Sequence, residues 1–276
     1  MPFANNQGVN IHYDATGAGP AVVLVHGLTA SRRTWVDNGY PEALERAGYR
    51  AIVMELRGHG QSDKPHDPAA YTRELVVGDV LAVLDAAGAE RATYWGYSLG
   101  GAVGYACALL AAGRFDAFII GGMHPYQRRP AAGATGSAGP NRLEALRRGM
   151  QHYYDTVVKP ELKAPLPADR LARLLANDGE ALAAFMQGSF AWMAQDEALA
   201  HLTANTLLYA GDADPQHDGV QRAAAAITGS RFVSLPGLDH TAASVRADMV
   251  LPHVLPFLAS VHAATAAIPS PFMGEG

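Results

Sequence analysis

Apolar residues in this chain recur in short continuous runs, with amphipathic stretches between them. A short run of aliphatic and β-branched residues bounded by turn residues predicts a strand that is covered on both faces. Such strands are expected at residues 21–25, 50–56, 91–95, 115–121, 205–210 and 231–235. Residues 9–15 instead alternate apolar and polar positions, which is typical of an antiparallel strand with one face in water.

Helical patterns separate these strands. Apolar periodicity, with helix start and stop signals, predicts helices at residues 41–48, 71–88, 99–113, 216–227 and 241–260. Strands that alternate with helices are joined by right-handed crossovers and form a mostly parallel sheet with helices on both faces. The fold class is therefore α/β.

The alternation stops between residues 124 and 204. Residues 128–140 are a loop rich in Pro, Gly, Ala and Ser, and helices without a strand are expected at 143–158, 168–177 and 180–195. We therefore expect an α/β core of residues 1–123 and 205–262, with residues 124–204 inserted into it as a helical cap. Residues 263–276 show no pattern of a packed element and are expected to form a flexible tail.

Composition narrows the possible partners and compartment. The chain has 276 residues, a net charge of −5 and a single cysteine, Cys107. Because no Lys/Arg cluster is present and no apolar run reaches membrane-spanning length, we expect neither nucleic acid nor a membrane as a partner. One cysteine forms no intrachain disulfide, and no signal segment is recognised, so a cytoplasmic location is expected.

Residues 96–100, Gly-Tyr-Ser-Leu-Gly, form a G-x-S-x-G pattern at a predicted strand-to-helix junction. In this context the pattern is typical of a nucleophile elbow, a tight turn that presents a serine hydroxyl above the sheet. Gly96 and Gly100 flank Ser98 at positions where larger side chains would collide. Glycine–serine clusters also mark ordinary turns, but the strand and helix around this one favour a nucleophilic Ser98.

A nucleophilic serine needs a general base, and the base needs an acid that orients it. In a parallel sheet such groups gather beyond the carboxyl ends of the strands, here in the order serine, acid, histidine. His240 follows the last predicted strand and is the candidate base. Asp212 and Asp214 both follow the preceding strand, and chain order leaves both open as the acid. His124 ends the strand after the elbow and is a candidate for the pocket wall.

The oxyanion formed during acyl transfer needs backbone N–H donors. The amide of Leu99, the residue after Ser98 at the start of a helix, is one candidate. The other is the amide of Leu28, which follows His26 and Gly27 in the loop after the strand at 21–25. Glycine in this loop allows the backbone to approach closely.

These motifs, with residues 57–62 (RGHGQS), 211–215 (GDADP) and 237–240 (GLDH), resemble the α/β-hydrolase superfamily, and the resemblance extends over residues 9–258. It is strongest to the capped, cofactor-free, esterase-like serine hydrolases. It implies an α/β-hydrolase fold with a mostly parallel eight-stranded sheet, and it selects Asp214, three residues beyond Gly211, as the acid. It also implies that neither a cofactor nor a metal takes part, and that the partner is a small-molecule ester.

The same resemblance implies a set of substrate contacts: His26, Gly27, Tyr97, His124 and Trp192. Tyr97 precedes the nucleophile, at a position that can help select the substrate. Trp192 is one of several large apolar residues of the cap that suit a pocket wall, although their helical spacing also fits an ordinary cap core.

Within this superfamily, Ser98 argues against the epoxide hydrolases and haloalkane dehalogenases, because their nucleophile is Asp. Carbon–carbon bond hydrolases usually have Asn where this chain has Tyr97, and cofactor-free haloperoxidases favour a proline near Leu28 and Thr29. The expectation is a carboxylesterase or lactonase that acts on small to medium esters through an acyl-enzyme. A carbon–carbon hydrolase of a ring-cleavage diketone and a non-catalytic ligand receptor of the same fold are the alternatives.

Overall fold

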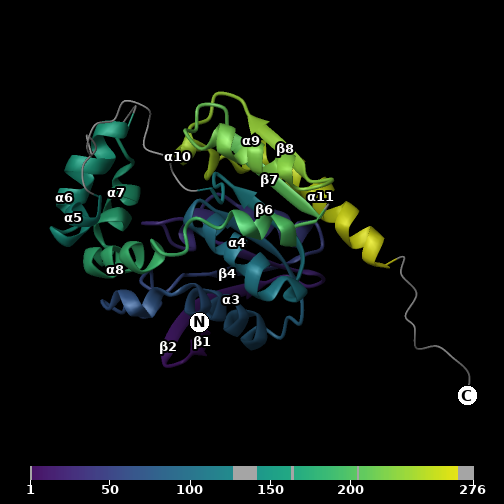
Figure 1. The fold of residues 1–276 in the computed structure, drawn as a ribbon, viewed down its shortest axis with the longest axis horizontal. Helices are drawn as coiled ribbons and strands as arrows, with labels where there is room; N and C mark the ends of the chain where they lie inside the picture. Colours follow the sequence, from purple (N-terminus) through teal and green to yellow (C-terminus); the bar gives the residue numbers. More distant parts are fainter. Residues whose placement is uncertain (1, 127–141, 163–164, 204, 267–276) are drawn as a thin grey trace, which may run out of the picture.

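An eight-stranded sheet runs through the part of the chain that the computed structural model describes, residues 2–126, 142–162, 165–203 and 205–266 (Figure 1). Its strand order is β1-β2-β4-β3-β5-β6-β7-β8. β2 pairs antiparallel with β1 and β4, and the other pairs are parallel, so the predicted mostly parallel sheet is confirmed. The strands are β1 (Phe3–Asn6), β2 (Val9–Thr16), β3 (Ala21–Val25), β4 (Arg50–Met54), β5 (Ala92–Tyr97), β6 (Phe115–Gly121), β7 (Thr206–Gly211) and β8 (Arg231–Leu235).

β1 is a strand that the apolar pattern does not predict, because its sequence Phe-Ala-Asn-Asn is half asparagine. Gln7 and Gly8 join it to β2 with φ angles of 51° and 88°. Two consecutive positive φ angles are typical of the type I′ hairpin turn, whose twist matches that of paired strands. Turn geometry therefore defines this edge of the sheet.

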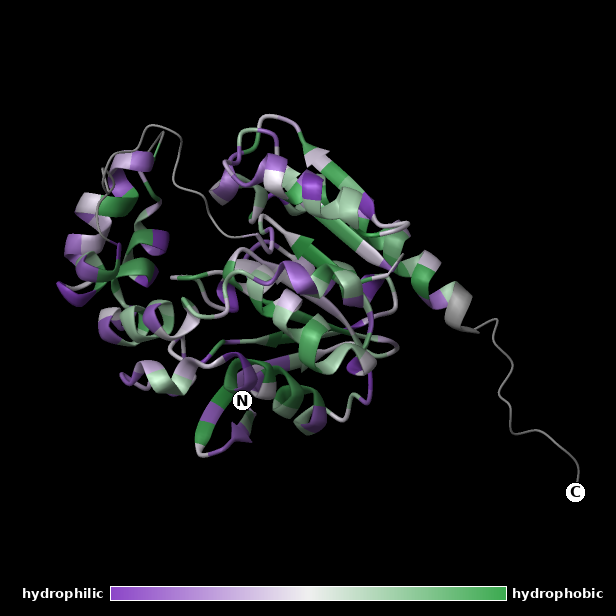
Figure 2. Cartoon of the chain, viewed as in Figure 1, coloured by the Kyte–Doolittle hydropathy of each residue, from purple (hydrophilic) through white to green (hydrophobic). Residues whose placement is uncertain are grey.

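Successive residues of the central strands face two separate cores, as the period of a strand requires. Val23 and Val25 pack with α3 (Arg73–Ala86), α4 (Leu99–Ala111) and α9 (His217–Ala226). Val22 and Leu24 pack with α1 (Arg33–Val36), α2 (Tyr40–Arg46), α10 (His240–Ala243) and α11 (Ala247–Ala266). Figure 2 shows the central strands in apolar colour, between these two layers of helices. The helices around the sheet are α1 (Arg33–Val36), α2 (Tyr40–Arg46), α3 (Arg73–Ala86), α4 (Leu99–Ala111), α9 (His217–Ala226), α10 (His240–Ala243) and α11 (Ala247–Ala266), with short 3₁₀ turns at Pro68–Tyr71, Ala112–Arg114 and Asp196–His201.

Two of the expected helices are each divided. Gly149, with a φ of 102°, splits the stretch 143–158 into α5 (Arg142–Arg147) and α6 (Met150–Tyr153), and a π-helical turn at Tyr154–Val158 continues α6. The stretch 241–260 forms α10 and α11 in place of one helix. α11 extends to Ala266, inside the predicted tail. The rest of that tail, 267–276, and the predicted loop 128–140 lie outside the described residues.

Helices α5, α6, α7 (Ala168–Leu175) and α8 (Gly179–Ser189) lie beside the sheet, at the left of Figure 1, with a 3₁₀ turn at Lys159–Glu161. They share an apolar cluster of their own, which includes Leu146, Leu174 and Leu182. Leu28 of the core packs against this cluster and against the core on the α4 side of the sheet. These helices occupy the stretch expected to form a cap, and the division of the chain into core and cap stays a prediction.

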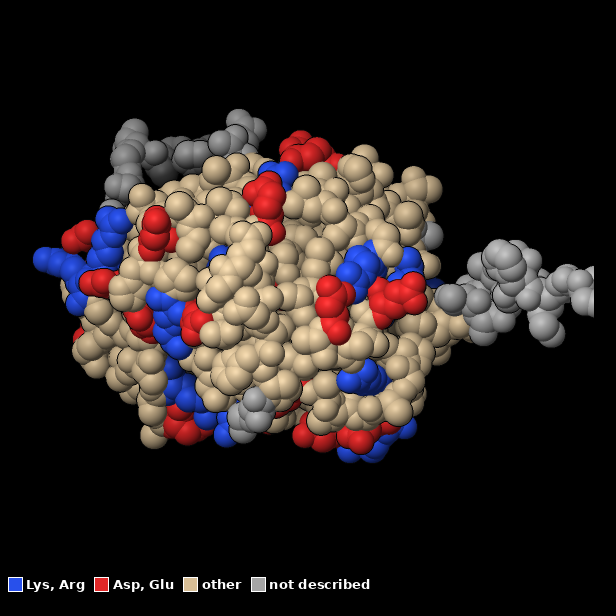
Figure 3. Space-filling model, turned by 90° about the horizontal axis from the view of Figure 1, so that it is seen from below, with Lys and Arg blue, Asp and Glu red and all other residues tan. Residues whose placement is uncertain are grey.

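Charged side chains of both signs are interspersed on the face shown in Figure 3. Exposed ion pairs of the molecule include Arg114–Asp85 and Arg148–Glu144. Pairs of this kind contribute about 0–1 kcal/mol each to stability.

Among the described helices, none has both the length and the apolar character needed to cross a bilayer.

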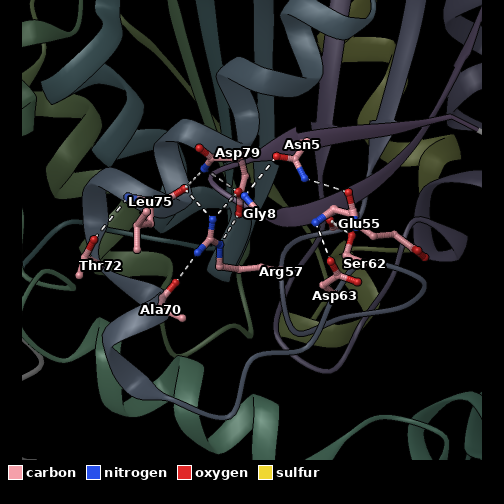
Figure 4. A network of polar contacts seen from close by, with 12 residues as sticks. Asn5, Gly8, Glu55, Arg57, Ser62, Asp63, Ala70, Thr72, Leu75 and Asp79 are labelled. Carbon is pink, nitrogen blue, oxygen red and sulfur yellow. Dashed lines mark hydrogen bonds and ion pairs between the residues drawn. The ribbon is translucent and has the colours of Figure 1, made fainter.

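A buried ion pair joins Arg57, which follows β4, to Asp79 of α3 (Figure 4). The two side chains are 1% and 0% exposed. Nε and Nη2 of Arg57 each donate to the Asp79 carboxylate at 2.6 Å, and Arg57 also donates to the carbonyls of Ala70 and Leu75. Asn6 of β1 donates to Asp79 at 2.9 Å. This network ties the loop after β4 to α3 and to the edge of the sheet.

Asp79→Ala is expected to lower the free energy of unfolding by about 3–5 kcal/mol, because it leaves the Arg57 guanidinium buried without its counter-ion. Asp85→Ala removes the exposed partner of Arg114 from the same helix and should cost less than about 1 kcal/mol. Urea denaturation followed by circular dichroism measures both losses. Equal losses in the two variants would contradict this interpretation.

Candidate active site

Ser98 lies at the junction of β5 and α4 in a left-handed backbone conformation, with φ 54° and ψ −112°. A non-glycine residue holds this conformation only where its surroundings enforce it. The Ser98 amide donates to the carbonyl of Gly121 at 2.9 Å. A Cβ at Gly96 would lie 2.2 Å from the carbonyl oxygen of Gly100, and a Cβ at Gly100 would lie 2.1 Å from that of Val25. Glycine is therefore required on both sides of the serine.

The structure brings Ser98, His240 and Asp214 together. His240 Nε2 lies 2.9 Å from Ser98 Oγ, and His240 Nδ1 lies 2.7 Å from Asp214 Oδ2. His240 begins α10 after β8, and Asp214 follows the neighbouring parallel strand β7, so both residues lie at the carboxyl edge of the sheet. Because an ionised carboxylate only accepts hydrogen bonds, Nδ1 carries the imidazole proton and Nε2 accepts from the serine hydroxyl.

The two candidate acids have different positions. The Asp214 side chain is 0% exposed, and its second oxygen accepts from the amide of Gln216 at 2.8 Å. Asp212 is exposed, and its carboxylate accepts from the amide of Gly237 at 2.7 Å, in the loop before His240. Asp214 is therefore the partner of the imidazole, and Asp212 supports the loop that carries it.

The loop after β3 lies directly against the serine. A Cβ at Gly27 would lie 3.3 Å from Ser98 Cβ and 3.8 Å from Ser98 Oγ. The next residues form a turn in which the Ala30 amide donates to the Gly27 carbonyl at 3.2 Å and Thr29 has a φ of 62°. Leu28 lies within this turn. Leu99 is the first residue of α4, so its amide has no acceptor within the helix. The amides of Leu28 and Leu99, the two predicted oxyanion donors, therefore belong to the two backbone segments next to Ser98.

His26 is buried behind the loop after β3. Its Nδ1 lies 2.8 Å from the carbonyl oxygen of Gly27, and its Nε2 accepts from the amide of Leu56 at 3.2 Å. Burial lowers the pKa of His26, which keeps the imidazole neutral. Both ring nitrogens therefore help to hold the loop in shape, and a contact of His26 with substrate stays a prediction.

The other predicted substrate contacts also have structural partners. The Tyr97 side chain is 5% exposed, and its hydroxyl donates to the carbonyl of His240 at 2.6 Å. Trp192 is 4% exposed, and its indole N–H donates to the carbonyl of Tyr71 at 3.0 Å. Both side chains are thus nearly buried and bonded to the protein backbone, and their roles in substrate binding stay predictions. His124 packs against Gly219 of α9, and its role in substrate binding stays a prediction.

A contact that the sequence analysis missed joins the helices beside the sheet to the loop after β3. Nδ2 of Asn177, at the end of α7, donates to the carbonyl of Thr29 at 3.1 Å. The next residue, Asp178, lies 2.9 Å from Nε2 of His66, which belongs to the loop after β4. The break between the predicted helices at Asp178-Gly179 was the one sign in the sequence of a turn at this place. It did not indicate that this turn would contact Thr29 and His66.

No group of three or more His, Cys, Asp or Glu side chains within the described ranges is arranged to hold a metal ion.

Comparisons with known proteins agree with this geometry. A family model described as the alpha/beta hydrolase fold matches residues 20–130. Epoxide hydrolase 2 of Siraitia grosvenorii is 32% identical over 127 residues, which are 46% of this chain and 40% of that protein. The chain thus spans less than half the length of this relative.

Two solved structures are similar over nearly their whole length. The enol-lactonase from Burkholderia xenovorans is 26% identical, with a TM-score of 0.79 over 94% of this chain and 100% of that one. A thermophilic esterase from Thermogutta terrifontis, at 22% identity, reaches the same TM-score of 0.79 over 95% and 98%, and this likeness shows the fold alone. With the sheet order and the elbow, these matches show that the chain has the α/β-hydrolase fold.

Asp214→Asn is expected to slow the reaction of Ser98 with a fluorophosphonate probe by about 10³–10⁴-fold, because an amide no longer selects the Nδ1–H form of His240. Asp212→Asn should leave this rate nearly unchanged, because its side chain contacts only the loop. Intact-protein mass spectrometry measures the inactivation rate of each variant. A larger loss in Asp212→Asn would reverse the assignment.

Proposed function

We propose that this protein is a serine hydrolase that cleaves small to medium carboxylic esters or lactones. The observation that carries the proposal is the continuous contact from Ser98 Oγ through the His240 imidazole to the buried Asp214 carboxylate, at 2.9 Å and 2.7 Å. A serine hydroxyl becomes a useful nucleophile when a base within hydrogen-bond reach takes its proton and a third group orients that base.

In the proposed reaction, Ser98 Oγ bonds to the carbonyl carbon of the ester while its proton passes to His240 Nε2. Asp214 stabilises the resulting imidazolium through the Nδ1 hydrogen bond. The amides of Leu28 and Leu99 donate to the developing oxyanion. His240 then returns the proton to the leaving alkoxide. Water, deprotonated by His240, attacks the acyl-enzyme and releases the acid, which restores the Ser98 hydroxyl.

The nucleophile distinguishes ester cleavage from epoxide hydrolysis, the activity for which the matching epoxide hydrolases are named. A carboxylate that opens an epoxide forms an ester, which water can cleave at its carbonyl. A serine that opened an epoxide would form an ether, which has no carbonyl and would not be hydrolysed. Because this chain has Ser98 on the elbow, an acyl substrate fits the site. The likeness to an enol-lactonase, at 26% identity over 94% of the chain, supports lactones as one candidate class.

Ser98→Ala is expected to lower kcat by about 10⁴-fold or more, by analogy with removal of the nucleophile from other serine hydrolases. The assay is a p-nitrophenyl ester series of increasing acyl length together with small lactones. Ser260→Ala, an exposed position on α11, is the matched control and should retain the wild-type rate. A Ser98→Ala variant with near-normal kcat would remove Ser98 from the mechanism, and tight ligand binding without turnover by the wild type would favour a receptor.

A further inference from the structure

Tyr97 precedes the nucleophile but lies on the opposite side of the sheet from α4. Residues of β5 alternate between the two cores, so Tyr94 packs with α4 while Trp95 and Tyr97 pack with α2 and α11. The side chain therefore extends beneath the carboxyl edge of the sheet, toward the segment that carries His240.

The Tyr97 hydroxyl donates to the backbone carbonyl of His240 at 2.6 Å, and the two ring centroids are 5.3 Å apart. His240 is the first residue of α10, which is four residues long. A helix this short has too few backbone hydrogen bonds to hold its first residue rigidly. At the other side of this turn, the Asp239 carboxylate accepts from the amide of Ala242 at 2.8 Å. Tyr97 thus supplies a bond from the rigid sheet to this short helix.

The end of β6 leaves space for this contact. A Cβ at Gly121 would lie 2.6 Å from Tyr97 Cδ2. A Cβ at Gly122 would lie 2.8 Å from the Tyr97 hydroxyl oxygen and 3.1 Å from His240 Cε1. Two successive glycines therefore allow the tyrosine and the imidazole to lie together against the backbone of β6.

We propose that Tyr97 is a positioning residue, whose hydroxyl holds the backbone of His240 so that Nε2 stays within hydrogen-bond distance of Ser98 Oγ. This inference rests on the proposed serine hydrolase function. Burial raises the pKa of the Tyr97 hydroxyl well above its ordinary value, so this group remains a donor at every pH at which the site would work. Displacement of a catalytic group by about 1 Å can cost about 10²-fold in rate, so one hydrogen bond of this kind has a measurable effect.

Tyr97→Phe tests the proposal, because it removes the hydroxyl and keeps the ring. The expected result is a fall in kcat of about 10- to 100-fold with KM nearly unchanged, because the hydroxyl is buried and bonded to the backbone of His240. Tyr209→Phe is the matched control. Tyr209 is 1% exposed, its ring centroid lies 6.0 Å from that of Tyr97, and its hydroxyl accepts from Trp95 at 3.2 Å. This variant should lose stability and keep the wild-type kcat.

A second measurement does not depend on turnover. The proton shared by His240 Nδ1 and Asp214, at an N···O distance of 2.7 Å, should give a far-downfield proton NMR signal. In Tyr97→Phe this signal should broaden through faster exchange with water, whereas in Tyr209→Phe it should remain sharp. Unchanged kcat and an unchanged signal in Tyr97→Phe would overturn the proposal, as would an increase in KM alone. If the wild type hydrolyses no ester, the proposed function fails, and the NMR comparison still decides whether Tyr97 holds His240.

Discussion

The close approach of α4 to the end of β3 is the constraint on which the candidate site depends. The Val25 carbonyl oxygen lies where a side chain on residue 100 would collide with it, at 2.1 Å from an added Cβ. This approach brings the loop that contains Gly27 and Leu28 against Ser98, at the first turn of α4. Backbone packing therefore arranges Ser98 and the amides of Leu28 and Leu99. Groups placed in this way need little reorganisation during a reaction.

The other half of the site is held by hydrogen bonds between loops. Asp214 and His240 come from segments beyond β7 and β8, and Asp212 joins these segments through the amide of Gly237. Tyr97 adds a bond from the central sheet to the backbone of His240. The site thus combines a part defined by packing, around Ser98, with a part whose geometry depends on a few specific polar contacts.

Patterns along the chain predicted the features that depend on spacing: the buried strands, the elbow, and the order in which Ser98, Asp214 and His240 occur. They did not predict β1, because a hairpin turn and not hydrophobicity defines it. The partners of the Tyr97 and Trp192 side chains were also not predicted. Strand alternation places Tyr97 on the same face as Trp95, and the carbonyl that receives the Trp192 indole belongs to Tyr71, which is far away in the sequence. Whether Asp212 or Asp214 is the partner of His240 depends on the path of the turn after β7, and spacing along the chain does not determine that path.

The hydrogen bond from Asn177 to the Thr29 carbonyl connects the helices beside the sheet to the loop that lies against Ser98. Thr29 follows Leu28 in the turn that faces the nucleophile, and Asn177 follows the end of α7, one of the helices beside the sheet. A substitution that moves the end of α7 is therefore transmitted through this hydrogen bond to the turn beside the nucleophile.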